Sequence, residues 1–279
     1  MVVFVGLAFS GQATSSDLLI AASWAFLCFS LAASSIYLVN DWIDRERDRQ
    51  HPTKRMRPIA AGEVSGLTAF IMAATLGFGA VGCALQFAPA VLPALGAYLV
   101  LQVAYSVRLK HVVIVDVFCI STGFLLRVLA GVWAIGVPVS PWLVACTVEL
   151  ALFLALCKRK AELLALGPDG TTRPLLTKYA GHGLDQMISV VASATVVTYA
   201  LYTLLPSTLL QFDVALNSRA GQPGMVWTLP FVLYILLRYL NLVYRQELGQ
   251  NPNRVLLTDI PLLVAAVGYG AVVCKVVYF

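Results

Sequence analysis

The chain has 279 residues, of which 59% are hydrophobic and 12% are charged, and its formal net charge is +5. The mean hydropathy is +0.83, and several apolar stretches continue for 18 residues or more. Soluble domains lack such stretches, and the stretches are too long to be the strands of a membrane barrel. We therefore predict an all-α polytopic membrane protein.

Eight full transmembrane helices are predicted, after a short apolar segment near the amino terminus. At about 1.5 Å per residue this first segment, residues 1–10, is too short to cross a bilayer. We expect the sequence to begin inside its first helix, with a re-entrant segment as the alternative, and no basic residues precede it as a signal peptide would require. The eight predicted spans are residues 18–40, 65–86, 89–107, 112–135, 141–157, 186–206, 225–244 and 256–276.

The basic residues predict the orientation. If the spans alternate in direction, all but three of the 19 Lys and Arg residues fall on one side, which the positive-inside rule makes cytoplasmic. The basic residues are not interleaved with aromatic residues as they are in a nucleic-acid site, so we predict no nucleic-acid partner. We predict one membrane domain, residues 1–279, with cytoplasmic catalytic loops near 40–62, 105–116, 158–184 and 245–259.

The densest charge in the chain directly follows the first full span. Asp41, Asp44 and Asp48 are spaced i, i+3 and i+7, which places three carboxylates on one face of a helix. Three like charges repel each other unless a cation lies among them, and Mg²⁺ prefers one or two carboxylates together with substrate phosphates. A merely solvated face is the weaker interpretation, because the acids begin while the apolar helix is still continuing. The spacing therefore predicts a Mg²⁺-diphosphate site, with these three residues as metal ligands and catalytic groups.

Further polar residues lie in or beside later spans. Asp116 and Arg127 are 11 residues apart, about three helical turns, so they share a face but lie too far apart to pair. Ionised groups are costly at membrane depth, so each needs another partner. Basic residues at the ends of spans have simpler explanations, since Lys158 and Arg159 could be topology anchors and Arg238 could snorkel to the interface. Asp259 precedes a proline in a helix-start pattern and could cap the last helix.

The motif Asn40-Asp41-x-x-Asp44-x-x-x-Asp48 resembles the first aspartate motif of the UbiA superfamily of intramembrane prenyltransferases. This resemblance implies a bundle of about nine transmembrane helices around a central cavity. Residues 51–62, 109–111, 123–131 and 158–163 are more narrowly similar to the decaprenyl-phosphate phosphoribosyltransferase branch of that superfamily, and the resemblance extends over residues 18–265.

The branch implies transfer of a 5-phosphoribosyl group from phosphoribosyl pyrophosphate to a polyprenyl phosphate, for cell-wall arabinan precursors in a bacterial-type plasma membrane. Mg²⁺, with Mn²⁺ as the alternative, would stabilise the departing pyrophosphate, and the acceptor phosphate needs no general base. The sequence leaves open whether the protein forms a homo-oligomer. The implied donor-binding residues are Asn40, Lys54, Arg55, Arg57, Tyr105 and Asp116, and the implied acceptor-phosphate residues are Lys110, Arg127, Lys158 and Arg159.

The second hypothesis is an aromatic or quinone-type prenyltransferase of the same fold that uses a prenyl diphosphate. The sequence departs from the superfamily pattern in two places, and the first departure separates this hypothesis from the phosphoribosyltransferase. Aromatic prenyltransferases usually carry a second Asp-x-x-x-Asp motif, but here Asp116 is followed four residues later by Ile120, which favours the phosphoribosyl donor. The family's basic, aromatic lead-in before the first span is missing, so its contacts are not assigned. A membrane cation transporter is the third hypothesis. It would place acids at the midplane in broken helices with an inverted repeat, and the sequence shows neither feature.

Overall fold

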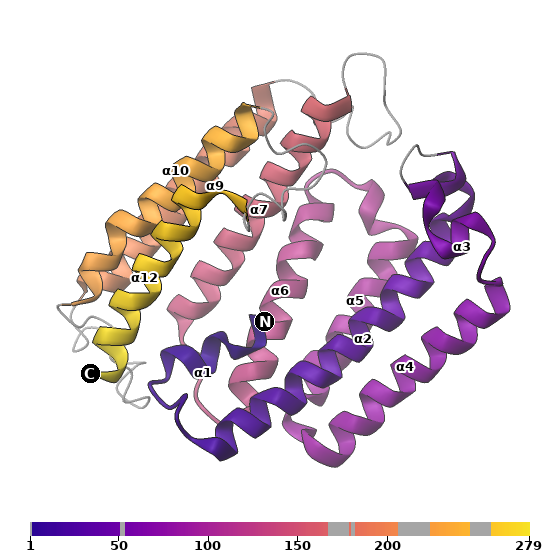
Figure 1. Cartoon of the computed structure of the whole chain (residues 1–279), viewed down its shortest axis with the longest axis horizontal. Coiled ribbons are helices and arrows are strands. Elements are labelled where there is room, and N and C mark those ends of the chain that lie inside the picture. Colours follow the sequence, from indigo (N-terminus) through magenta and orange to yellow (C-terminus); the bar gives the residue numbers. More distant parts are fainter. Residues whose placement is uncertain (1, 51–53, 167–178, 180–181, 206–223, 246–257) are drawn as a thin grey trace. The chain divides into compact units, whose positions relative to one another are not determined.

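The structure, a computed structural model, describes residues 2–50, 54–166, 179, 182–205, 224–245 and 258–279 (Figure 1). Every regular element in these ranges is helical, and eight helices are long and apolar enough to cross a membrane. The prediction of an all-α polytopic membrane protein is thus confirmed. Residues 51–53 of the basic stretch, and parts of the predicted loops 158–184 and 245–259, lie outside the described residues.

The chain divides into two compact units, which are described separately. The first comprises Met1–Ala8, Gln12–Cys119 and Leu125–Val137, and the second comprises Phe9–Gly11, Ile120–Phe124 and Pro138–Phe279. Elements that lie wholly or mostly in the first unit are η1 (Val2–Phe4), α1 (Val5–Phe9), α2 (Ser16–Arg49), η2 (Lys54–Met56), α3 (Pro58–Ala61), α4 (Gly66–Phe87), η3 (Pro89–Val91), α5 (Leu92–Val107), η4 (Leu109–His111) and α6 (Val115–Ala134).

The described part of the second unit contains four long helices and one short one. Helix α9 packs against α7, and α10 contacts α7, α9 and α12. Its elements are α7 (Pro141–Leu166), α9 (His182–Leu204), η6 (Met225–Thr228), α10 (Leu229–Tyr244) and α12 (Ile260–Tyr278).

Helix α2 departs most from its predicted span. The sequence predicted a span at residues 18–40, whereas the helix continues to Arg49 and is 34 residues long. No glycine or proline occurs within it, so no residue interrupts the backbone hydrogen bonds. Its length is about 50 Å, against a hydrocarbon core of about 30 Å. The acidic segment is therefore the rigid continuation of a membrane helix.

Small side chains allow α2 and α4 to pack side by side (Figure 1). Ser35 Oγ on α2 donates a 2.7 Å hydrogen bond to the Ala73 carbonyl on α4. A Cβ at Gly77 would lie 3.2 Å from the same hydroxyl. Without a hydrophobic driving force inside lipid, such close backbone approach is what holds membrane helices together. This contact places the start of α4 beside the charged end of α2.

The short helix α3 folds back against the end of α2. Arg49 Nε donates a 3.0 Å hydrogen bond to the Ala60 carbonyl, which fastens α3 to α2. Gly62 ends α3 with a φ of +85°, a conformation that glycine adopts without strain. Ser65 then caps α4, since its side chain accepts from Thr68 N at 3.1 Å. The turn between the spans is therefore held by specific hydrogen bonds.

A polar contact joins three helices of the second unit. Lys160 Nζ on α7 lies 2.7 Å from Asp185 Oδ1 on α9, and Tyr244 OH on α10 donates to the same oxygen at 2.7 Å. The ammonium also lies 5.2 Å from the centroid of the Tyr244 ring. These contacts fasten one end of the unit.

Asp259 caps α12, as the helix-start pattern indicated. Its Oδ1 accepts from Leu262 N at 2.9 Å. Arg238 does not simply snorkel, because its Nη2 donates to Asp259 Oδ2 at 2.7 Å and its Nε donates to Oδ1 at 3.2 Å. The hydrogen bonds from this guanidinium hold the pKa of the Asp259 carboxyl below its ordinary value.

This lowered pKa predicts an acid-dependent stability. The ionised Asp259 stabilises the fold above its unfolded pKa of about 3.9, and this contribution is lost as the pH falls through the lower folded pKa. Asp259→Asn keeps an oxygen acceptor for the cap but carries no charge. We expect the difference in melting temperature between wild type and Asp259→Asn to shrink as the pH falls from about 6 toward 3. A difference independent of pH would contradict the assignment.

Gly131 on α6 makes room for the amino-terminal segment. A Cβ at this position would overlap the backbone carbonyl of Val3, which has no flexible side chain to move aside. A Cβ added at Gly82 on α4 would meet no atom within 4 Å. An alanine in a helix is ordinarily favoured over glycine by about 1 kcal/mol, so any loss at Gly131 reflects the overlap.

We expect Gly131→Ala to lower the melting temperature of the purified protein in detergent, because Val3 must shift. Gly82→Ala, the matched control, should leave it unchanged or raise it slightly. Equal melting temperatures for the two variants would show that the amino-terminal segment does not pack against α6 as described.

Candidate active site

Two of the three predicted metal ligands converge on one nitrogen atom. Arg57 Nη1 donates to Asp41 Oδ1 at 2.6 Å and to Asp48 Oδ2 at 2.9 Å. Asp48 is 5% exposed, so its charge requires a close partner. Arg57 immediately precedes α3, and the turn through η2 and α3 carries it back to α2. The sequence analysis assigned Arg57 to the donor phosphates and did not predict this ion pair with Asp41 and Asp48.

The third aspartate is paired with a cation from a distant part of the sequence. Lys110 Nζ, in η4, donates to the two carboxylate oxygens of Asp44 at 2.8 and 2.9 Å. It also donates to Asn40 Oδ1 at 3.4 Å. The sequence analysis assigned Lys110 to the acceptor phosphate and did not predict this contact with Asp44. The structure therefore adds a sequence-distant residue to the acidic cluster.

The segment that carries Lys110 includes a strained residue. Ile114, directly before α6, has a φ of +70°, which is rare for a β-branched residue and costs about 1–3 kcal/mol. Asp116, two residues later, is completely buried in the first turn of α6. Backbone hydrogen bonds of 3.1 Å from Val112 N to the Leu109 carbonyl and from Asp116 N to the Val112 carbonyl hold the segment, so Lys110 and Asp116 are placed by an ordered link.

Arg127 lies within an apolar span, where an ionised side chain needs a polar partner, and the structure supplies one. Its Nη2 donates to Tyr98 OH on α5 at 2.7 Å, and its guanidinium lies 4.7 Å from the centroid of the Tyr98 ring. Along α6 it lies about 16 Å from Asp116. Sequence analysis missed Tyr98, because an aromatic residue in an apolar span carries no polar signal.

The other predicted residues are divided between the two units. Lys54 and Tyr105 are half-buried and Arg55 is exposed, all in the first unit. On α7, Lys158 is exposed, while the buried Arg159 donates to Glu162 at 2.5 Å. We define the acidic cluster as the residues that these contacts bring together, namely Asn40, Asp41, Asp44, Asp48, Arg57 and Lys110.

The acidic cluster fits a divalent cation by its chemistry. Within the described residues no three His, Cys, Asp or Glu side chains form a ready-made metal site, because the aspartates turn to Arg57 and Lys110. Arg57 Nη1 nevertheless marks a point within 3 Å of two carboxylates, Asp41 and Asp48. Hard oxygen donors in this number suit Mg²⁺, which completes its coordination with water and substrate phosphates. The assignment of the three aspartates as metal ligands stays a prediction.

Sequence analysis also missed Glu149 in the middle of α7. Its Oε1 accepts from Thr198 Oγ1 on α9 at 2.9 Å. Its Oε2 is buried and has no hydrogen-bond partner in the described part of the chain. A carboxyl group in an apolar span is itself a signal of function or specific packing, so this residue could have been found.

Comparison with known proteins places the chain in a family. The sequence profile of the UbiA prenyltransferase family matches residues 1–165, more than half of the chain. The chain belongs to the UbiA prenyltransferase family. Two of its relatives are the decaprenyl-phosphate phosphoribosyltransferases of Mycobacterium tuberculosis and Corynebacterium glutamicum, both 36% identical to it. The matches cover 92% and 91% of this chain, and 82% and 75% of the respective relatives.

A solved structure supports the UbiA fold independently. The UbiA homolog from Archaeoglobus fulgidus, bound to DMAPP and Mg²⁺, superposes with a TM-score of 0.70 and 17% sequence identity. The superposition covers 99% of this chain and 94% of that protein. At this identity the likeness shows the fold alone. The predicted membership of the UbiA superfamily, and the resemblance to the decaprenyl-phosphate phosphoribosyltransferase branch, are both confirmed.

The ion pairs of this UbiA-family chain predict unequal roles for neighbouring arginines. Arg57→Ala would leave Asp41 and the buried Asp48 without their shared donor, which should destabilise the fold by about 1–3 kcal/mol. Arg55→Ala removes an exposed side chain and should change stability by about 0.5 kcal/mol or less. Chemical denaturation of the two purified variants in mixed micelles measures both. If Arg57→Ala is as stable as Arg55→Ala, the pairing with Asp48 is not formed.

Proposed function

We propose that the protein transfers a 5-phosphoribosyl group from phosphoribosyl pyrophosphate to a polyprenyl phosphate of decaprenyl type, with release of pyrophosphate. The observation that carries the proposal is the acidic cluster, in a chain whose relatives at 36% identity are decaprenyl-phosphate phosphoribosyltransferases over most of both lengths. The proposed setting is a bacterial plasma membrane, with the cluster on the cytoplasmic side and the product used for cell-wall arabinan.

The charges of the acidic cluster support a divalent cofactor. Its three aspartates outnumber the two cations, Arg57 and Lys110, so the cluster carries one net negative charge when all groups are ionised. A site of that sign repels pyrophosphate, which is itself strongly anionic. One Mg²⁺ on Asp41, Asp44 and Asp48 would reverse the sign and neutralise the leaving pyrophosphate. Mn²⁺ stays the alternative ion.

The two cations of the cluster have a second use in this proposal. Arg57 and Lys110 are internal counterions of the carboxylates, and Arg57 also has N–H donors beyond the two on Nη1 that bind Asp41 and Asp48. A guanidinium beside a diphosphate forms strong charge-assisted hydrogen bonds. Donor binding would therefore let Arg57 exchange carboxylate oxygens for phosphate oxygens without leaving the cluster.

The remaining residues divide between donor and acceptor. Asn40, Tyr105 and Asp116 are proposed to bind ribose hydroxyls, and Lys54 and Arg55 to assist Arg57 on the phosphates. As the bond from ribose C1 to pyrophosphate breaks, positive charge develops on the ribose, and an oxygen of the acceptor phosphate bonds to C1. The acceptor is already an anion, so no base is required. Its phosphate is proposed to bind cations, for which the candidates are Lys110 and Arg127 in the first unit and Lys158 and Arg159 in the second.

The proposal is tested with purified protein, phosphoribosyl pyrophosphate, decaprenyl phosphate and Mg²⁺, with products identified by mass spectrometry. We expect decaprenyl phosphoribose 5-phosphate and pyrophosphate, and no product after chelation of divalent cations. Asp41→Asn preserves side-chain shape and should lower kcat by about 100-fold or more, if charge stabilisation is the main catalytic term. Glu46→Gln, which alters an exposed carboxylate on the same helix, is the matched control and should stay near wild type.

The rival chemistry has a distinct result. A protein that ignores phosphoribosyl pyrophosphate, yet attaches a prenyl chain from a prenyl diphosphate to 4-hydroxybenzoate, would be an aromatic prenyltransferase of the same fold. Full activity of Asp41→Asn under limiting Mg²⁺ would remove the acidic cluster from the mechanism while leaving the family assignment intact.

A further inference from the structure

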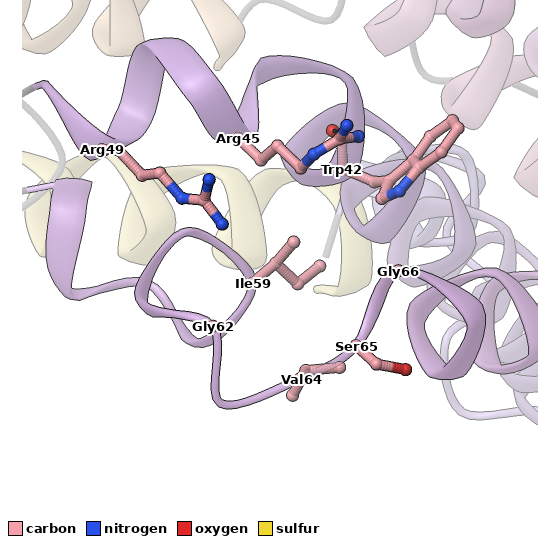
Figure 2. Close-up of a pocket in the computed structure, with 8 residues that line it drawn as sticks. All are labelled: Trp42, Arg45, Arg49, Ile59, Gly62, Val64, Ser65 and Gly66. Atoms are coloured by element: carbon pink, nitrogen blue, oxygen red, sulfur yellow. Dashed lines mark hydrogen bonds between the residues drawn. The ribbon is translucent and has the colours of Figure 1, made fainter.

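A cavity of about 400 Å³ lies against another face of the charged end of α2 (Figure 2). Three residues of α2 line it with the same i, i+3 and i+7 spacing as the aspartates, but one position later, which is about 100° around the helix. The opposite wall comes from α3 and from the start of α4. The residues that matter for its chemistry are Trp42, Arg45, Arg49, Ile59, Ser65 and Gly66.

The charges that line this cavity are all positive. Arg45 and Arg49 both line it, and no carboxylate is among its described lining residues. Figure 2 shows the Arg45 guanidinium beside the Trp42 ring and the Arg49 guanidinium near Ile59. Arg45 is held by a stacking contact, 5.2 Å from the Trp42 ring centroid, and Arg49 by its bond to the Ala60 carbonyl. Both cations are therefore held at the cavity.

Each arginine retains hydrogen-bonding capacity for a ligand. Arg45 uses Nη1 on the Trp42 carbonyl and Nε in a 3.4 Å contact with Glu46, while Arg49 uses Nε and Nη1. The Nη2 group of each has no partner in the described part of the chain. The ion pairs with Glu46 are exposed and contribute about 0–1 kcal/mol, so they compete weakly with an anion.

Neutral donors surround the same space. In the described part of the chain, the amides of Gly66 and Leu67, the first two of α4, make no hydrogen bond, whereas Thr68 and Ala69 are bonded to Ser65. The Trp42 indole nitrogen is close by, since a Cβ at Gly66 would lie 2.7 Å from it. Two guanidinium groups, an indole and a helix start thus converge on a single cavity, and Glu46, the acid paired with both arginines, is exposed and does not line it.

The surface next to the cavity is apolar and exposed. On the first turns of α4, Leu67, Phe70 and Ile71 are 71%, 65% and 54% exposed. Helix α4 is one of the candidate membrane spans, so we expect this surface to contact lipid tails. Tryptophan and arginine are typical of the boundary between tails and head groups. A soluble phosphate would use the cavity alone, whereas a membrane lipid would use the cavity and the apolar surface together.

We propose that this cavity binds the phosphate of an anionic phospholipid, whose acyl chains lie along Leu67, Phe70 and Ile71. The phosphate accepts from Arg45 and Arg49, and the Gly66 amide and Trp42 indole supply neutral donors. The site is separate from the acidic cluster. It depends on insertion of α4 into a membrane and not on the proposed transferase activity.

Native mass spectrometry of the whole protein in detergent, titrated with phosphatidylglycerol, tests the proposal. The double variant Arg45→Gln/Arg49→Gln should weaken binding of the first lipid by about tenfold or more, because it removes two charge-assisted contacts. Arg47→Gln is the matched control, since Arg47 is exposed on the same helix end but does not line the cavity. Equal weakening by the control, or wild-type binding by the double variant, would overturn the site.

A second variant separates loss of binding from loss of folding. Gly66→Ala retains both arginines but pushes on the Trp42 indole, and it should weaken phosphatidylglycerol binding while the protein still shows a cooperative melting transition. Two competitors identify the source of the phosphate. Displacement of the lipid by inorganic pyrophosphate would show a soluble-anion site. Displacement of phosphatidylglycerol by an equal concentration of decaprenyl phosphate would show an acceptor site. Either result would overturn the phospholipid assignment.

Discussion

Neutralisation of three like charges at the end of α2 is the constraint on which the surrounding structure depends. Asp41, Asp44 and Asp48 cannot share one helix face without counterions. In the sequence, Arg57 comes before the membrane helices α4 and α5, and Lys110 comes after them. Arg57 draws the η2–α3 turn onto α2, and Lys110 draws η4 onto it. The same ion pairs therefore fold this end of the unit and leave donors in place for a phosphate ligand.

Local patterns predicted the helices and the acidic face, because apolar run length and helical periodicity are properties of neighbouring residues. They did not predict which cation meets which acid. Lys54, Arg55 and Arg57 are equivalent in the sequence, yet Arg57 bridges two aspartates, and the partner of Asp44 lies 66 residues away. Tyr98 was missed because its role depends on α5 packing beside α6. Glu149 was visible as a carboxyl group within an apolar run and was overlooked.

One helix end presents two chemically opposite faces. The acidic face, with its counterions, suits a metal and a polar donor, whereas the arginine face opens toward the start of α4 and an apolar surface. A rotation of about 100° separates them, and no ion pair joins the two sets of charges in the described part of the chain. This arrangement allows a hydrophilic substrate and a membrane lipid to approach the same end of α2 without competing for the same side chains.

The unbroken length of α2 has a mechanical consequence. A helix with no glycine, proline or bulge resists bending, so it accommodates a mismatch with bilayer thickness mainly by tilting. Tilting changes the height of its far end above the head groups, and the acidic cluster moves with that end. Membrane thickness thus becomes a variable that sets how far Asp41 and Asp48 stand from the lipid surface on which a polyprenyl phosphate must present its head group.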